Sequence, residues 1–197
     1  GRSGGELLQE LTRKQDVAAA EGAFASLMEA STDDAYQALQ QEIQDEADVH
    51  RVVLSWRAWL MLDLAGSQYA HTLLRQSLRY CVATERRMHD RKYPASTIRT
   101  QLPKLFDQYK LTGRTLVTVK PAAACIVSSS RTLMRSSLSA AAEAAAAALA
   151  EGIAPDAIAE ALCLAGNGLV LHDPGRSESQ QQPDKPVGSC HGDSVGV

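Results

Sequence analysis

Apolar residues recur at intervals of three and four positions through most of this chain, which is the spacing of one face of an α-helix. The pattern is clearest in the series Val49, Val52, Val53, Trp56, Trp59 and Leu60. A half-buried strand instead needs alternation with a period of two, and the β-rich run at residues 115–119 is isolated and closely followed by a proline. The sequence therefore predicts an all-α fold, a multi-helix bundle of about seven helices with an irregular C-terminal tail.

Composition and charge divide the chain into four stretches. Residues 1–111 are predicted to form a helical region with an acidic first part and a basic second part. Residues 1–65 contain five basic and twelve acidic side chains, whereas residues 66–120 contain eleven and three. We expect the basic part to dock on the acidic part, since the chain itself supplies both charges. Residues 112–127 are predicted to be a linker, residues 128–172 an alanine-rich helical hairpin and residues 173–197 an irregular tail.

Properties of the whole chain limit the class of protein. It has 197 residues, 45% of them hydrophobic, and a net charge of −3, which suits a folded domain and excludes a wholly disordered chain. It has no apolar run long enough for a membrane span, and its four scattered cysteines lack a CxxC pair, so we expect reduced thiols and a cytoplasmic protein. Its alanine-rich segment permits close helix packing and its first residue is not methionine, so we expect a homo-oligomer or a piece of a larger chain.

Two positions carry specific packing predictions. Trp56 and Trp59 lie on the apolar stripe named above, so both are predicted to be buried, and Trp56→Ala is expected to cost about 3–5 kcal/mol. Gly168 interrupts the apolar run at residues 162–171, and glycine weakens a helix by about 1 kcal/mol relative to alanine. We therefore expect another helix, or a ligand, to approach the backbone closely at Gly168.

The segment from Leu149 to Leu162 reads Leu-Ala-Glu-Gly-Ile-Ala-Pro-Asp-Ala-Ile-Ala-Glu-Ala-Leu. Over these fourteen residues it resembles the helix–loop–helix of the carboxymuconolactone decarboxylase and alkylhydroperoxidase D superfamily. The peroxidases of that family carry a CxxC pair and a nearby histidine on the helix before this turn. Here that helix, at residues 136–150, has neither cysteine nor histidine. The resemblance thus implies the helical scaffold without the thiol peroxidase activity.

Histidines and carboxylates are the residues that best suit a chemical site. His191 and Asp193 lie on either side of a glycine, in a segment with little need of histidine for packing, and His71 begins a helix. We assign these three as candidate catalytic residues. Imidazole and carboxylate together suit a divalent transition metal, or a general base that an acid partner holds in one tautomer. The candidate metal ligands are His50, His71, His172 and His191.

Two classes of function are compatible with this pattern. The first is an enzyme on an all-helical scaffold, whose histidine/carboxylate site, with or without a metal, acts on a small-molecule substrate. The second is a non-catalytic helical interaction or oligomerisation module. A nucleic-acid partner is disfavoured, because the pI is about 6.0 and no nucleic-acid-binding motif accompanies the basic run at residues 75–92. The sequence leaves the cofactor and the substrate unassigned.

The tail histidine offers a direct test of the enzyme alternative. We expect His191 and Asp193 to pack back on the helical body near His71 or His172, with His191 as metal ligand or general base and Asp193 accepting its second ring N–H. His191→Ala should then abolish activity or metal content while changing the free energy of unfolding by less than about 1 kcal/mol. Proteolytic removal of everything after Pro174 without loss of activity would contradict this.

Overall fold

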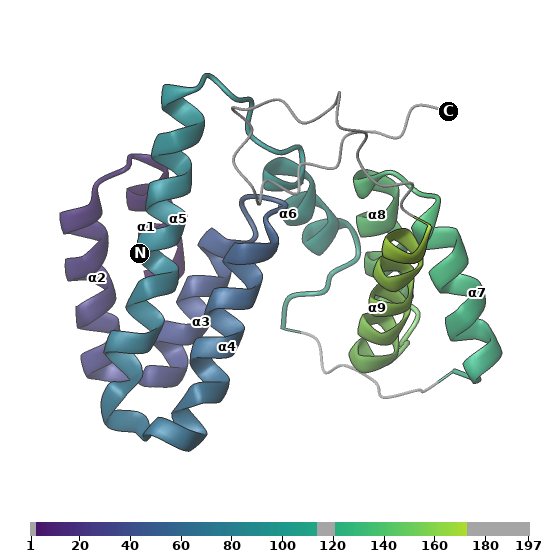
Figure 1. The fold of residues 1–197 in the computed structure, drawn as a ribbon, viewed down its shortest axis with the longest axis horizontal. Coiled ribbons are helices and arrows are strands. Elements are labelled where there is room, and N and C mark those ends of the chain that lie inside the picture. Colours follow the sequence, from purple (N-terminus) through teal and green to yellow (C-terminus); the bar gives the residue numbers. More distant parts are fainter. Residues whose placement is uncertain (1–2, 114–120, 173–197) are drawn as a thin grey trace. The chain divides into compact units, whose positions relative to one another are not determined.

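A computed structural model describes residues 3–113 and 121–172 of the chain, which form helices joined by short loops (Figure 1). Within those two ranges there are nine α-helices, one short 3-10 helix and no strand, so the all-α prediction is confirmed. The expected number of about seven helices is too low. The hairpin predicted at residues 128–172 consists of three helices, because Ser137 caps a helix of its own and separates it from the preceding one. The predicted tail lies outside the described residues.

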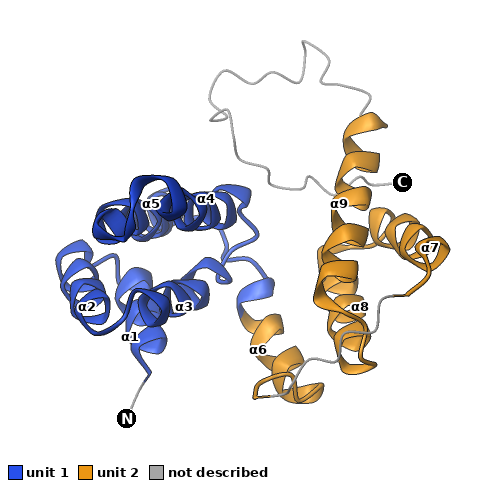
Figure 2. Ribbon diagram, turned by 90° about the horizontal axis from the view of Figure 1, so that it is seen from below, with its two compact units in different colours: residues 1–99 blue, residues 100–197 orange. Residues whose placement is uncertain are grey.

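The chain divides into two compact units, residues 1–99 and residues 100–197, whereas the sequence placed the first boundary at residue 111 (Figure 2). The helices of unit 1 are α1 (Gly4–Arg13), α2 (Val17–Ala30), α3 (Thr32–Ile43), α4 (Val49–Ala65), the 3-10 helix η1 (Ser67–Tyr69) and α5 (Ala70–Asp90). The helices of unit 2 are α6 (Ile98–Gln108), which begins at the end of unit 1, α7 (Ala123–Met134), α8 (Leu138–Ala150) and α9 (Pro155–Leu171). Helix α7 thus begins inside the segment predicted to be a linker.

Oxygen-bearing side chains set the starts of four helices in unit 1. Each accepts a hydrogen bond from a backbone N–H that has no partner within its own helix. Ser3 and Glu6 form a reciprocal capping box on α1, and Asp16, Ser31 and Asp48 cap α2, α3 and α4. These caps explain why the chain can turn sharply between short helices without leaving backbone donors unsatisfied.

Unit 1 is built from two layers of helices. Helices α1, α2 and α3 pack on one another, and the pair α4 and α5 covers them (Figure 2). The core consists of fully buried apolar side chains from α1, α2, α3 and α5, chiefly Leu8, Phe24, Leu39, Leu74 and Leu78. Helix α4 lies at the edge, where it contacts α5, η1 and α3. Only one narrow face of α4 is therefore buried against the rest of unit 1.

A polar cluster occupies that buried face of α4. Arg51 has no exposed surface, and its guanidinium donates to the backbone oxygen of Glu42 at 2.9 Å. The same group donates to the Thr84 hydroxyl at 3.0 Å and to a carboxylate oxygen of Glu85 at 2.8 Å. The other buried residues of this face are small: Ser55 and Ala58. A guanidinium this deeply buried has to keep its partners, because an unpaired buried charge is far more costly than a paired one.

The apolar stripe of α4 consequently faces outward. The exposed apolar residues on the side opposite Arg51 are Val49, Val52, Trp56, Leu60 and Leu64. The prediction that Trp56 is buried is wrong, since 52% of the residue is exposed. Trp59 is half-buried and stacks on Tyr36 with ring centroids 4.3 Å apart. The reason is geometric: α4 has a single face toward the core, and the arginine and its partners fill it.

Unit 2 has a thinner core of small side chains. Helix α9 packs along α7 and buries a row of alanines, Ala154, Ala157 and Ala161, against Ile126. A Cβ atom at Gly168 would lie 2.6 Å from the sulfur of Met134 on α7. The neighbour at Gly168 is thus the side chain of Met134 on another helix, which is one of the two alternatives that the sequence left open.

We predict that the buried arginine matters far more to unit 1 than the exposed tryptophan. Arg51→Ala should lower the free energy of unfolding by about 3–5 kcal/mol, because it leaves buried polar partners unsatisfied. Trp56→Ala should lower it by less than about 1 kcal/mol in dilute protein, as expected at a half-exposed position. Urea denaturation followed by circular dichroism measures both. Equal losses for the two variants would contradict the prediction.

Candidate functional site

His50 lies in a hydrogen-bonded group with Asp48 and Tyr80. The ring Nδ1 lies 3.2 Å from a carboxylate oxygen of Asp48, which also caps α4 by accepting the His50 backbone N–H. The Tyr80 hydroxyl donates to the other oxygen of Asp48 at 3.0 Å. Partial burial and this hydrogen bond raise the pKa of Tyr80 to about 12. A tyrosine that acts as a base or nucleophile needs a lowered pKa, so Tyr80 is not activated. The role of Asp48 that the contacts do show is to cap α4.

The structure does not gather the other candidate residues around His50. His71 is partly buried in the first turn of α5 and stacks on Phe24, with ring centroids 6.0 Å apart. His50 lies beside Tyr80, nine residues further along α5, which corresponds to roughly 13 Å along a helix. His172 ends α9 and is exposed. Among residues 3–113 and 121–172 no three histidine, cysteine or acidic side chains come together to hold a metal ion.

The remaining candidates, His191 and Asp193, lie outside the described residues. Their expected packing against His71 or His172 therefore stays a prediction. So does the assignment of His50, His71, His172 and His191 to a metal.

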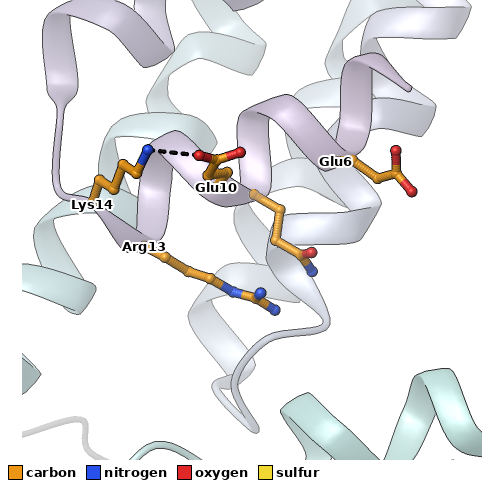
Figure 3. A pocket seen from close by; sticks show the side chains of 5 residues that line it. Glu6, Glu10, Arg13 and Lys14 are labelled. Carbon is orange, nitrogen blue, oxygen red and sulfur yellow. Dashed lines mark hydrogen bonds and ion pairs between the residues drawn. The ribbon is translucent and has the colours of Figure 1, made fainter. Parts of the chain in front are cut away.

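A shallow hollow of about 460 Å³ runs along the outer side of α1 (Figure 3). Its lining is polar and already engaged: Lys14 pairs with Glu10 at 2.6 Å, and Glu6 accepts the Ser3 backbone N–H. Arg13 forms two hydrogen bonds to the buried carboxylate of Asp45. Because these side chains serve the helix and the core, the hollow does not present a charged group that is free for a ligand.

The basic side chains of α5 are partly explained by pairing inside unit 1. Arg75 makes two hydrogen bonds to Glu21 on α2, and Arg79 forms an ion pair with the same carboxylate at 2.6 Å. Hydrogen bonds and charge from both arginines lower the pKa of Glu21, against a smaller effect of desolvation; the Arg75 hydrogen bond is the largest cause. The basic part of the sequence thus docks on the acidic part at this point, as expected.

Glu42 is the titratable group whose environment is most unusual. It has no exposed surface; one oxygen accepts from the Thr12 hydroxyl at 2.5 Å, and the other, Oε1, has no hydrogen-bond partner. Burial raises the pKa of Glu42 to about 8, although the hydrogen bond from Thr12 and the charge of Arg51 oppose this. The side chain is therefore mostly protonated at neutral pH. It is a structural group, because none of its atoms reaches the surface.

The outer face of α4 is the feature of unit 1 that its own fold does not explain. Val52, Trp56, Leu60 and Leu64 follow one another at four-residue spacing and form a continuous exposed ridge, which we call the α4 ridge. Val49 and Met61 widen it. Leu64 is 83% exposed. The sequence pattern predicted this stripe but placed it in the core. Arg51 and Ser55 share the opposite face of α4, and this polar pair was the signal for a second face with its own buried partners.

Unit 2 carries a second, less continuous set of exposed apolar residues in the middle and at the end of α9: Leu162, Leu164, Leu169, Val170 and Leu171. They flank the buried alanine row on both sides and do not form a single ridge. None of the helices in the described ranges combines the length and apolar character needed to cross a membrane. The α4 ridge is therefore the best-defined candidate site that the described structure offers.

Comparison with known proteins gave no match to a family model, to a curated protein or to a solved structure. The resemblance of residues 149–162 to the carboxymuconolactone decarboxylase superfamily thus stays a prediction. In the structure this segment is the end of α8, a turn that contains Gly152 at φ 90°, and the first half of α9.

We predict that Glu42 makes unit 1 less stable as the pH rises. The folded state holds the carboxyl proton up to about pH 8, whereas the unfolded chain loses it near the ordinary value of 4.5. Between these values the folded state binds more protons, so the free energy of unfolding should fall by about 1 kcal/mol per pH unit from this group. Glu42→Gln should remove that slope. Urea denaturation at pH 5, 6, 7 and 8 measures it, and parallel curves for the two proteins would contradict the assignment.

Proposed function

We propose that this protein is a non-catalytic helical interaction module whose contact surface is the α4 ridge. The observation that carries the proposal is the orientation of α4: Arg51 and Ser55 are buried, whereas the apolar residues of the α4 ridge are exposed. An ordinary surface helix has the reverse arrangement. Monomeric proteins rarely expose a continuous apolar patch of this kind, and such patches mark contact sites with other molecules.

The shape of the ridge favours a helical partner. Side chains at four-residue spacing form a ridge that fits the groove between two such rows on another helix. Trp56 and Leu60 lie in the middle of the ridge, and a large aromatic side chain is typical of the centre of a contact surface. The free thiols of Cys81, Cys125 and Cys163 suit a reducing compartment, and we place the module in the cytoplasm on that ground.

The alternative is the histidine/carboxylate enzyme of the sequence analysis. Its central residues, His191 and Asp193, lie outside the described residues, so its support is the sequence pattern alone. Metal analysis of the purified full chain separates the two proposals: a stoichiometric transition metal that is lost with His191→Ala supports the enzyme.

Site-specific photo-crosslinking tests the contact surface. A benzophenone amino acid is placed at Leu64, on the ridge, or at Gln76, an exposed position on α5, and the full chain is irradiated in an extract of the cells that make it. We expect a discrete adduct from position 64, a much weaker one from position 76, and loss of the adduct when Leu60→Glu is added. Equal adduct yields from the two positions, or no effect of Leu60→Glu, would contradict the proposal.

A further inference from the structure

We infer that the occupant of the α4 ridge is a second copy of this chain, bound by a two-fold pairing of α4 with α4. The inference rests on the proposed function of the ridge as a contact surface. It is carried by three properties of the ridge: its periodicity, the two charged side chains that flank it and its area. Together these make the ridge complementary to itself.

The periodicity of the ridge fits the commonest way in which helices cross. Val52, Trp56, Leu60 and Leu64 are separated by four residues each, and rows of this type on two helices interlock when the axes cross at about −50°. A second α4 supplies a row of the same spacing. The apolar residues of one copy can then lie beside those of the other along the whole ridge.

The charges beside the ridge are self-complementary. Apart from His50 in its first turn, α4 has two exposed charged side chains, Arg57 and Asp63. Neither forms an ion pair within the part of the chain that the structure describes, although nearby arginines and carboxylates in unit 1 are paired. One copy thus offers an unpaired cation and an unpaired anion on the same face.

The positions of these two charges suit a two-fold axis. Arg57 lies three residues before Leu60 and Asp63 three residues after it, so they sit roughly 4.5 Å to either side along the helix and on opposite flanks of the ridge. A two-fold axis near Leu60, with the helices crossing at about −50°, brings each Arg57 beside the Asp63 of the second copy. The symmetry forms this ion pair twice.

The area of the ridge suits a reversible dimer. Its exposed apolar residues present on the order of 600 Å² per chain, so that two copies would bury somewhat more than about 1,000 Å² in total. This lies at the low end for specific interfaces, so we expect half-association at roughly 10–100 µM of chain. A membrane surface or a nucleic acid does not provide a row of apolar side chains at four-residue spacing, with one cation and one anion beside it, to match the ridge.

Charge exchange in the full chain tests the pairing by sedimentation velocity. Arg57→Asp and Asp63→Arg each turn both ion pairs into like-charge contacts and should weaken association about tenfold or more. The double variant restores opposite charges across the interface and should associate within about threefold of the wild type. Both substitutions are at exposed positions, so the circular dichroism of all three variants should be unchanged. A double variant as weak as the single variants would overturn the pairing.

The apolar part of the contact is tested by matched glutamate variants. Leu60→Glu should abolish association, whereas Leu169→Glu, at an exposed leucine of α9, should leave it unchanged. The opposite result would overturn the assignment to α4. In a Trp59→Phe background Trp56 is the single tryptophan, and its emission should shift to shorter wavelength as the chain concentration rises through the association midpoint.

Two outcomes separate this inference from the proposed function. If the adduct from position 64 has twice the mass of the chain and the charge exchange rescues association, both stand. If the chain sediments as a monomer at several hundred micromolar while position 64 crosslinks to a different protein, the second-copy inference is overturned and the proposed function stands. If the chain is monomeric and position 64 gives no more adduct than position 76, both are overturned.

Discussion

Burial of the Arg51 guanidinium is the interaction on which the arrangement of unit 1 depends. Glu85 accepts from Arg51 and also from Arg99 at 2.5 Å, and Arg99 lies 3.9 Å from the buried carboxylate of Asp45. Asp45 in turn binds Arg13 of α1 at 2.6 Å. One chain of charge-assisted contacts therefore connects α1, the loop after α3, α4, α5 and the start of α6. Removing any buried member would leave its partners without water or protein to replace it.

The hydrogen-bond partners in this network explain the protonation of Glu42. The carboxylates of Asp45 and Glu85 accept side-chain hydrogen bonds from the three arginines. Glu42 offers Arg51 its backbone oxygen, whereas its side chain accepts from a neutral hydroxyl of Thr12. Without a direct cationic partner, burial dominates and favours the neutral acid. Glu42 is therefore stable in this network as the neutral carboxylic acid, and ionising it would destabilise the folded state.

Most of the helical architecture could be predicted from sequence because its causes are local. The apolar periodicity predicted the helices, and Gly168 was expected to mark a close approach, which the Met134 side chain of α7 makes. The orientation of α4 could not be predicted in the same way. Periodicity shows that a helix has an apolar face, but the face that is buried depends on the sum of all its contacts. The partners of Arg51 are residues 42, 84 and 85. These partners lie outside α4, so the apolar pattern within α4 carries no information about them.

The polar interior and the apolar exterior of α4 are two consequences of one geometric constraint. A helix has 3.6 residues per turn, so Arg51, Ser55 and Ala58 share a face and the α4 ridge must lie on the opposite side. Rotating the ridge inward would expose Arg51 to water and leave Glu85 and Thr84 buried without it, which the added apolar burial would have to outweigh. The buried network therefore fixes the rotation of α4 about its own axis. In this fold the buried ion pair of Arg51 and Glu85 thus determines which side chains of α4 are exposed at the surface, namely those of the α4 ridge.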